Sequence, residues 1–242
     1  MIAWVKNLFK DSLIYGIGFG VSRFLQVLVL PIIARSLSLS EYGYYSNYVI
    51  FYTIAGGVFL LGMDNSVARF FFDSQDKLYH KKVFSIGLFC VLFVSFFVAI
   101  IFSFFPSALL KIISVPLAYS GALPFVLFTF PMLVLNNFFL NWFKWRRERF
   151  FFLINAIGTV ALLLIPLAVI KPVGFLFIFK TIFFSQLIVA IVSIALSIKY
   201  IRFFFDRSLF ISMLKYGFPW MLVFFLGLSR SYLDRFFLTH YL

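Results

Sequence analysis

Seven long runs of apolar residues constrain the fold of this chain more than any other feature. We place them at Ser12–Leu37, Tyr44–Met63, Val83–Phe105, Leu117–Trp142, Phe150–Ile170, Val173–Ile198 and Tyr216–Leu238. Each run is close to the roughly 20 residues that a helix needs to cross a bilayer, and the apolar residues are continuous rather than alternating. Because only helices and closed barrels satisfy their backbone polar groups in lipid, the runs predict transmembrane helices. The predicted fold class is an all-α, polytopic integral membrane protein.

The composition excludes an ordinary soluble domain. Apolar residues make up 64% of the 242 residues and charged residues only 12%, against roughly 45–50% and 25% in globular domains. A soluble domain of this size could not cover so much apolar surface. A water-soluble enzyme is therefore excluded. Nucleic acid is not an expected partner either, although the formal net charge is +13, because the sequence offers no soluble domain to carry an exposed basic face.

The connections between the runs alternate in positive charge. Basic residues gather in the N-terminal arm and after the second, fourth and sixth runs, at Lys6, Lys10, Arg69, Lys77, Lys81, Lys82, Lys144, Arg146, Arg147, Arg149, Lys199, Arg202, Arg207 and Lys215. The other three connections carry one each: Arg35, Lys111 and Lys171. The positive-inside rule places the basic connections in the cytoplasm. We therefore expect a multi-pass protein of the plasma membrane with a cytoplasmic N-terminus.

A boundary is expected after the sixth run. The segment 201–214, IRFFFDRSLFISML, combines apolar and basic positions that are typical of a short helix lying in the membrane interface. We therefore divide the chain into a six-helix unit at 1–200, a cytoplasmic connector at 201–215 and the first helix of a further unit at 216–242.

Arg23 is the first candidate for a functional residue, because it lies near the middle of the first run. An arginine at this depth costs roughly 2.5–3.5 kcal/mol on insertion scales, so such residues usually face a cavity or a partner. Gly16, Gly20, Arg23 and Val27 fall on one stripe of a helix. Gly16 and Gly20 form a GxxxG motif, which permits close helix contact. The alternative is that Arg23 snorkels to the interface or pairs with a carboxylate.

Besides Arg35 at the end of the first run, four other charged residues lie within the runs. Lys180 belongs to the sixth run, whose residues Thr181, Ser185 and Gln186 make it more polar than its neighbours. The alternative for Lys180 is a snorkelling side chain. The seventh run carries Arg230, Asp234 and Arg235. Arg230 and Asp234 are four residues apart and can pair on one helix face, which is the alternative to a binding role.

Other polar residues, within the runs or just beyond them, have structural interpretations. Asp64 and Arg69 are expected to form an ion cluster at the membrane edge, and Asn136, Asn137 and Asn141 to bond between helices. The sequence has no metal-ligand cluster and no phosphate-binding loop, so no cofactor is expected. Spans that are rich in cations and poor in acids suit an anionic substrate.

Three segments carry a resemblance to a known family. They are residues 30–45, LPIIARSLSLSEYGYY; residues 61–70, LGMDNSVARF; and residues 214–236, with Lys215-Tyr216-Gly217-Phe218-Pro219 and Asp234-Arg235-Phe236. The basic stretch RRERFFFLINAI at 146–157 adds to them. In order and spacing these segments resemble the O-antigen (Wzx-type) polysaccharide flippases of the MOP exporter superfamily, which is MATE-like.

The resemblance implies a fold of two six-helix lobes related by a pseudo-two-fold axis along the membrane normal. This chain is similar to the first lobe plus helix 7, so the expected architecture is one MATE-like six-helix lobe followed by a seventh helix. The matching motif residues implied to be structural are Glu41, Gly43, Arg69, Gly217, Pro219 and Asp234. The chain is expected to be a fragment, a truncated reading frame or half of a homodimer. We favour truncation, because one helix into a second lobe is an odd place for a subunit to end.

The resemblance also implies a function, namely transport of an undecaprenyl-pyrophosphate-linked oligosaccharide across the inner membrane in surface polysaccharide (lipopolysaccharide O-antigen) biosynthesis. The implied site is a cationic cavity lined by Arg23, Lys180, Arg230 and Arg235. Expected partners are this lipid-linked substrate, membrane lipids and the polysaccharide assembly machinery. No bond is made or broken, so the protein is not expected to be an enzyme. The alternatives are a drug or cation antiporter of the same superfamily, a membrane glycosyltransferase or polymerase, and a non-transporting scaffold.

Overall fold

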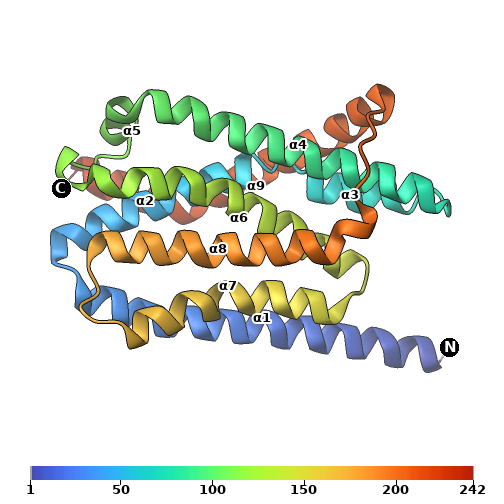
Figure 1. Ribbon diagram of the computed structural model, residues 1–242, viewed down its shortest axis with the longest axis horizontal. Helices are drawn as coiled ribbons and strands as arrows, with labels where there is room; N and C mark the ends of the chain where they lie inside the picture. The colour runs from blue at the N-terminus through green and yellow to red at the C-terminus, as the bar shows by residue number, and fades with distance from the viewer. Residues whose placement is uncertain (1, 242) are drawn as a thin grey trace.

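The computed structural model describes the backbone of residues 2–241 and the side chains of residues 12–227. The described chain is all-helical and contains no strand (Figure 1). Its elements are α1 (Ile2–Ser36), α2 (Leu39–Val58), α3 (Met63–Phe71), α4 (Lys77–Phe104), α5 (Pro106–Ile112), the 3₁₀ turn η1 (Leu117–Ala122), α6 (Leu123–Trp145), α7 (Arg149–Val169), α8 (Phe175–Ser197), the 3₁₀ turn η2 (Ile198–Tyr200) and α9 (Arg207–Tyr241).

Seven of the helical segments in the described residues are long and apolar enough to cross a membrane. They are Ser12–Ser36, Leu39–Phe71, Lys77–Phe104, Leu117–Trp145, Arg149–Val169, Phe175–Tyr200 and Arg207–Gly227. Each contains most or all of one predicted run except the last, which is given only to Gly227, the last residue with a described side chain. The prediction of an all-α, polytopic membrane protein is therefore confirmed.

The connections gather at two ends of the bundle (Figure 1). The start of α1, the α3–α4 and α6–α7 loops and the segment between η2 and α9 lie at one end, which we call the basic end. The α1–α2 turn, α5 and the α7–α8 loop lie at the opposite end. The alternation of loop charge in the sequence thus corresponds to the two ends of the molecule.

The second span is two helices rather than the single run predicted at Tyr44–Met63. α2 begins earlier, at Leu39, because Ser38 and Glu41 form a capping box in which each side chain accepts from the other's backbone N–H. The helix then breaks after Val58, where Leu61 and Gly62 take left-handed conformations with φ of 53° and 64°. α3 continues the span to Phe71.

The segment before the last helix also differs from the expectation. Residues 201–206 form no helix, and residues 207–214 are the first turns of α9 rather than a separate interfacial helix. The Asp206 side chain accepts a hydrogen bond from the backbone N–H of Leu209, 3.1 Å away, which fixes the start of α9. The division of the chain into two units at this segment stays a prediction.

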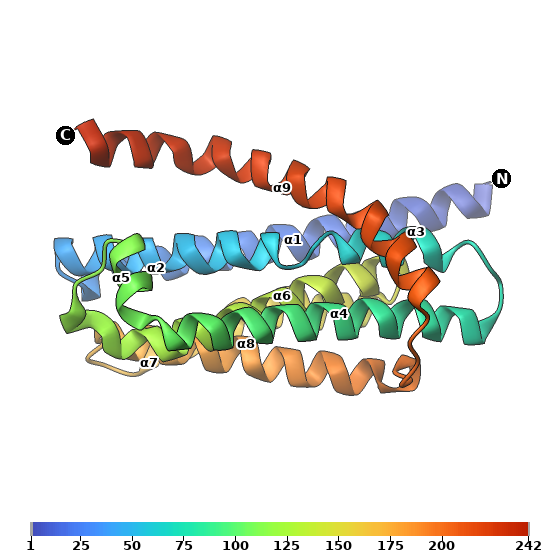
Figure 2. The ribbon, with the colours of Figure 1, turned by 90° about the horizontal axis from the view of Figure 1, so that it is seen from above.

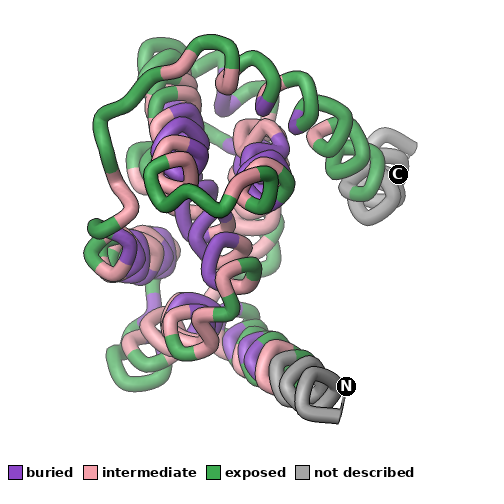
Figure 3. Tube along the Cα trace, turned by 90° about the vertical axis from the view of Figure 1, so that its right-hand side faces the viewer, coloured by how far each residue is buried: buried purple, intermediate pink, exposed green. Residues whose placement is uncertain are grey.

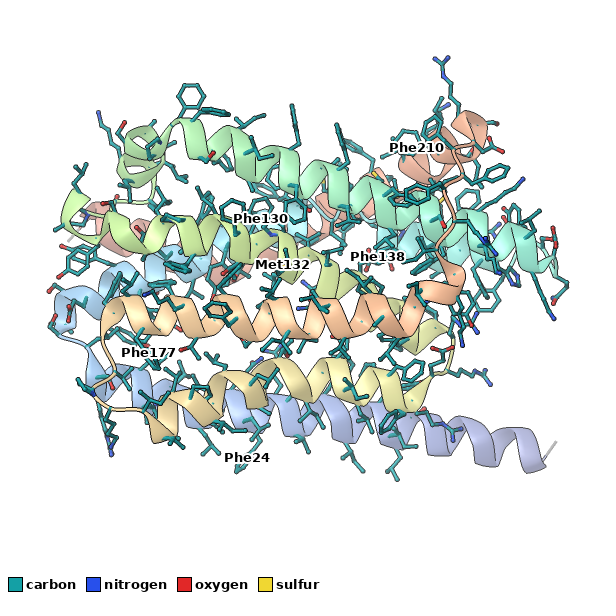
Figure 4. The ribbon with its side chains drawn as sticks, viewed as in Figure 1. Phe24, Phe130, Met132, Phe138, Phe177 and Phe210 are labelled. Atoms are coloured by element: carbon teal, nitrogen blue, oxygen red, sulfur yellow. The ribbon has the colours of Figure 1, made fainter. Side chains whose placement is uncertain are left out.

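α6 is the central helix of the bundle. It contacts α2, α3, α4, α7 and α8, and its residues Phe130, Phe138 and Phe139 are completely buried. Figure 4 shows Phe130, Met132 and Phe138 in the middle of the bundle. In the end-on view of Figure 3, the buried positions gather in the central helices, whereas α1 and α9 lie on one side of the molecule and are largely exposed.

Candidate functional site

Arg23 lies on the uncovered face of α1. α1 packs mainly against α7, through a stripe of buried or half-buried residues that includes Tyr15, Gly18 and Ser22. Arg23 points away from this stripe and is exposed; its Nη1 donates to Oε1 of Gln26 at 3.3 Å. The neighbouring Phe24 also points away from the bundle (Figure 4). No carboxylate pairs with Arg23 among the described residues, so the ion-pair alternative finds no partner there.

The GxxxG motif beside Arg23 makes no close helix contact in the described part of the chain. A Cβ built on Gly16 or Gly20 would have no neighbouring atom within 4 Å. The close approach is at Gly18, where a Cβ would lie 2.8 Å from Leu153 Cδ2 and 2.9 Å from Phe152 Cε1. The expected contact was therefore assigned to the wrong glycines, because large side chains of α7 face Gly18. Gly16 and Gly20 instead leave a shallow, open stripe next to Arg23.

This stripe belongs to a broad uncovered side of the bundle. In Figure 2, α1 and α2 lie on the side of the bundle that faces α9, and α8 lies on the opposite side. α9 contacts α2, α3 and α4, whereas several of its large apolar side chains, including Phe218, Val223 and Leu226, are more than half exposed. We call the exposed surfaces of α1 and α9 together the open face.

Lys180 does not join Arg23. It lies on α8, in an exposed stripe with Leu176, Phe184 and Ile188, and its Nζ is 5.7 Å from the centre of the Phe125 ring. α8 lies on the side of the bundle opposite α9 (Figure 2), so Lys180 and Arg23 belong to helices on different sides. The snorkelling alternative for Lys180 stays a prediction. The buried hydroxyl groups of Thr181 and Ser185 donate hydrogen bonds within their own helix, to the carbonyl oxygens of Phe177 and Ile182 respectively.

Three predicted residues of the seventh span fall outside the described side chains. Arg230, Asp234 and Arg235 belong to the last part of α9, whose backbone alone is described. Their roles in a cationic cavity and in the family motif stay predictions.

α9 crosses the second span at the break between α2 and α3. A Cβ on Gly62 would lie 2.2 Å from the carbonyl oxygen of Gly217, and one on Gly217 would lie 2.6 Å from that of Leu61. The Oγ of buried Ser66 donates to the carbonyl oxygen of Met213 at 2.7 Å. The resemblance implies a structural role for Gly217, and the close crossing supplies its physical reason. Glycine pairs of this kind let helix backbones approach.

Asp64 is buried beside the same break. The expectation of an ion cluster with Arg69 at the membrane edge is wrong, because Arg69 pairs with Asp73 instead. Asp64 is 9% exposed, and its Oδ2 accepts a hydrogen bond from Nδ2 of Asn141 at 2.7 Å. This side chain is therefore a buried carboxylate within the second candidate span. Its burial was not predicted from the sequence, because Asp64 was placed at the end of a continuous helix.

Further polar contacts join the central helices. Asn136 Nδ2 donates to Oε1 of Gln186 at 2.7 Å, and Asn155 Nδ2 donates to Oγ of Ser193 at 2.9 Å. These contacts hold α8 against α6 and α7. The prediction of bonds between helices is confirmed for Asn136 and Asn141. Among the described side chains, Asn137 forms no such bond.

The other motif residues have simple positions. Glu41 completes the capping box of α2, with Oε2 accepting from the backbone N–H of Ser38 at 2.9 Å. Gly43 is exposed, and a Cβ built there would meet no atom within 4 Å. Pro219 is exposed within α9, two residues after the glycine at the crossing.

Arg146, at the basic end, was interpreted from the sequence only as one of the positive charges that set the orientation of the chain in the membrane. The guanidinium carbon of Arg146 lies 4.2 Å from the ring centre of Tyr200 and 5.4 Å from that of Trp142, and Nε is 3.1 Å from Oε1 of Glu148. Arg146 is therefore a packing residue that ties the end of α6 to η2. The signal that could have found it is the aromatic residue at Trp142, one helical turn earlier.

Comparison with known proteins identifies the family of the chain. Neither the curated proteins nor the solved structures contain a significant match to the chain. The family model described as polysaccharide biosynthesis protein matches residues 8–242, which is almost the whole chain. The helical architecture and this match agree: the chain is a multi-pass membrane protein that belongs to the polysaccharide biosynthesis protein family.

Proposed function

We propose that this chain takes part in moving a lipid-linked oligosaccharide, carried on undecaprenyl pyrophosphate, across the bacterial inner membrane for surface polysaccharide assembly. The family match supports a role in polysaccharide biosynthesis. Sugars and pyrophosphate cannot cross hydrocarbon unaided, so their export needs a polar path through protein. In this proposal the basic end faces the cytoplasm, as the positive-inside rule favours.

The observation that carries the proposal is the position of Arg23. It is an exposed cation within an apolar span, and the open stripe at Gly16 and Gly20 lies beside it. An unpaired guanidinium in the lipid core is costly, so Arg23 requires an anion, water or protein on the open face. A pyrophosphate matches the planar, multi-donor guanidinium better than any neutral substrate.

The open face also needs a covering partner. Alternating access in transporters arises when two repeats rock about a site between them. We propose that a second lobe or a second copy of the chain faces α1 and α9, and that Arg23 lines the space between. Arg230 and Arg235 stay candidates for the same lining, whereas Lys180 belongs to α8, which lies on the side of the bundle opposite α9 (Figure 2).

The test is surface polysaccharide production in the native host with Arg23→Ala in the chromosomal gene. Loss of a charge-assisted bond to the pyrophosphate costs about 1.5–3 kcal/mol, or about 10–100-fold in export rate. We expect this loss together with lipid-linked oligosaccharide accumulating on the inner leaflet and an unchanged amount of protein. Arg23→Lys should retain part of the activity, since the charge stays but the fork of donors is lost.

Lys111→Ala is the matched control. Lys111 is an exposed cation on α5 at the opposite end of the bundle, so its removal should leave export unchanged. Equal export by the Arg23→Ala and Lys111→Ala strains would overturn the assignment of Arg23.

A second candidate function rests on Asp64. An antiporter for drugs or cations needs an intramembrane carboxylate, and Asp64 is buried within the second span. In proteoliposomes that contain the complete transporter, Asp64→Asn would then abolish the dependence of transport on a proton or sodium gradient. Transport of a lipid-linked sugar with unchanged gradient dependence in this variant would reject the antiporter role.

A further inference from the structure

A groove with a cationic lining lies at the basic end, between the start of α4 and the segment that leads to α9. Its volume is about 500 Å³, and its lining includes Leu78, Lys81, Lys82, Arg202, Phe203 and Phe204. Three of these residues are cations, and no carboxylate belongs to the lining. We call this hollow the connector groove.

The connector groove has a fixed wall. The backbone N–H of Arg202 donates to Oγ of Ser85 at 2.8 Å, and the same hydroxyl bonds to the carbonyl oxygen of Tyr200 at 3.3 Å. Lys82 Nζ lies 4.3 Å from the centre of the Phe204 ring. These contacts hold the segment against α4 although residues 201–206 are not helical, so the cations are presented from two sides of one hollow.

An apolar ridge leads from the groove along the outside of α4. The Phe203 ring, which is 93% exposed, stacks on Phe89 with ring centres 5.2 Å apart. One and two turns further along α4, Phe93 and Phe97 stack on each other at 5.7 Å and are 71% and 51% exposed. In a membrane-spanning helix, exposed rings of this kind face the acyl chains of the bilayer.

We propose that the connector groove binds the phosphate of an anionic phospholipid of the surrounding bilayer, with an acyl chain of this lipid along the ridge of Phe89, Phe93 and Phe97. A cationic hollow at the membrane surface that continues into an apolar strip is complementary to such a molecule in both charge and polarity. The bound lipid would fix the segment between the first six-helix unit and α9.

The nearest acidic residues in the sequence are already engaged. Asp76 Oδ1 accepts from the backbone N–H of Leu78 at 3.0 Å, and Asp206 Oδ1 accepts from that of Leu209 at 3.1 Å. Each carboxylate thus caps a helix, and neither forms an ion pair with Lys81, Lys82 or Arg202 within the described side chains. The charge of the groove is therefore free to attract a phosphate.

The experiment is a native mass spectrometry titration of the purified whole chain with dioleoylphosphatidylglycerol and with dioleoylphosphatidylcholine. The two lipids share acyl chains and differ in net charge. We expect one tightly retained phosphatidylglycerol. In the triple variant Lys81→Gln, Lys82→Gln and Arg202→Gln its apparent Kd should rise by about fivefold per cation, on the order of 100-fold in all.

The control removes the same charge from elsewhere at the basic end. Lys199, Arg207 and Lys215 are exposed and do not line the groove. Their triple substitution by glutamine should leave the retained phosphatidylglycerol in place. Equal weakening in the two triple variants would overturn the proposal in favour of a diffuse surface potential, and equal retention of the two lipids would overturn it outright.

Two single variants keep the proposal testable if the triple variant does not fold. Arg202→Gln changes only an exposed side chain, because the bond to Ser85 comes from the backbone, and it should weaken binding about fivefold. Phe203→Ser tests the ridge with all cations present and should weaken phosphatidylglycerol retention without changing the preference over phosphatidylcholine. Unchanged binding in these two variants would reject the site.

Discussion

Gly62 and Gly217 are in backbone contact where α9 crosses the second span. A Cβ on Gly62 would lie 2.2 Å from the carbonyl oxygen of Gly217, and Gly62 itself has a φ of 64°. Both conditions favour glycine at position 62, because any other residue would be strained at this positive φ and its side chain would collide with α9. The second span is therefore joined to α9 through a contact that has no room for a side chain.

Gly217→Ala should weaken this contact. The added methyl group would lie 2.6 Å from the carbonyl oxygen of Leu61 and 2.8 Å from Oγ of Ser66, neither of which can move far. We expect a loss of about 1–3 kcal/mol in the free energy of unfolding in detergent micelles.

Gly227→Ala is the control on the same helix. A Cβ on Gly227 meets nothing within 4 Å, so this change should be neutral or stabilising by up to about 1 kcal/mol through helix propensity. Similar melting temperatures for the Gly217→Ala and Gly227→Ala proteins would argue against the crossing.

Ser66→Ala removes the hydrogen bond that accompanies the crossing. Ser66 is completely buried, and its Oγ is 2.7 Å from the carbonyl oxygen of Met213. Bonds between membrane helices are worth about 0.6–1.7 kcal/mol, so thermal unfolding should show a loss in that range. Ser103→Ala breaks only a local bond to Ile100 on an exposed surface and should have little effect. A larger loss in Ser103→Ala than in Ser66→Ala would contradict this ranking.

Asn141→Ala should destabilise the protein by leaving the buried carboxyl group of Asp64 without its amide donor. The expected cost is about 1–3 kcal/mol. A double-mutant cycle with Asp64→Ala should give a coupling energy of about 0.5–3 kcal/mol, measured by chemical unfolding. Asn137→Ala, at a half-buried position on the same helix, is the comparison variant. If the effects of Asp64→Ala and Asn141→Ala on the free energy of unfolding are additive, the pairing of these two residues is ruled out.

Ser38→Ala should shorten or fray the start of α2. The Ser38 hydroxyl accepts a hydrogen bond from the backbone N–H of Glu41, and the Glu41 carboxylate accepts one from the backbone N–H of Ser38. Loss of a cap of this kind costs about 0.5–2 kcal/mol.

Protease sensitivity near residue 38 is the measurement for this cap, and it should increase in Ser38→Ala and in Glu41→Ala. Gly43→Ala should not increase it, because Gly43 is exposed and has room for a methyl group. Unchanged cleavage in the Ser38→Ala protein would mean that the cap contributes nothing measurable.

Much of the architecture follows from the sequence by length and polarity. Apolar runs of bilayer length must become helices, because unpaired backbone groups are costly in lipid. The charge of the connections predicted which loops share an end, and Figure 1 shows them together. Ser38 and Glu41 have the spacing of a capping box, so the start of α2 at Leu39 could also have been predicted from local chemistry.

Positions set by partners distant in the sequence could not be predicted in this way. The spacing of Gly16 and Gly20 indicated a close helix contact, but the contact forms at Gly18 because Phe152 and Leu153 of α7 face that glycine. Lys180 looked equivalent to Arg23 as a cation within a span, and both are exposed. They differ because α1 lies on the side of the bundle that faces α9, whereas α8 lies on the opposite side (Figure 2). Neither difference is encoded in a local pattern.

The sequence by itself determined that this protein is a bundle of membrane-spanning helices with one basic end, because hydrophobicity and loop charge act on each segment separately. Only the tertiary structure decided that the second span breaks at Leu61 and Gly62, that Asp64 is buried against Asn141, and that Arg23 is uncovered. These features depend on which helices meet. Packing between residues far apart in the chain supplies the contacts that favour a left-handed residue or a buried carboxylate, and no single segment contains that information.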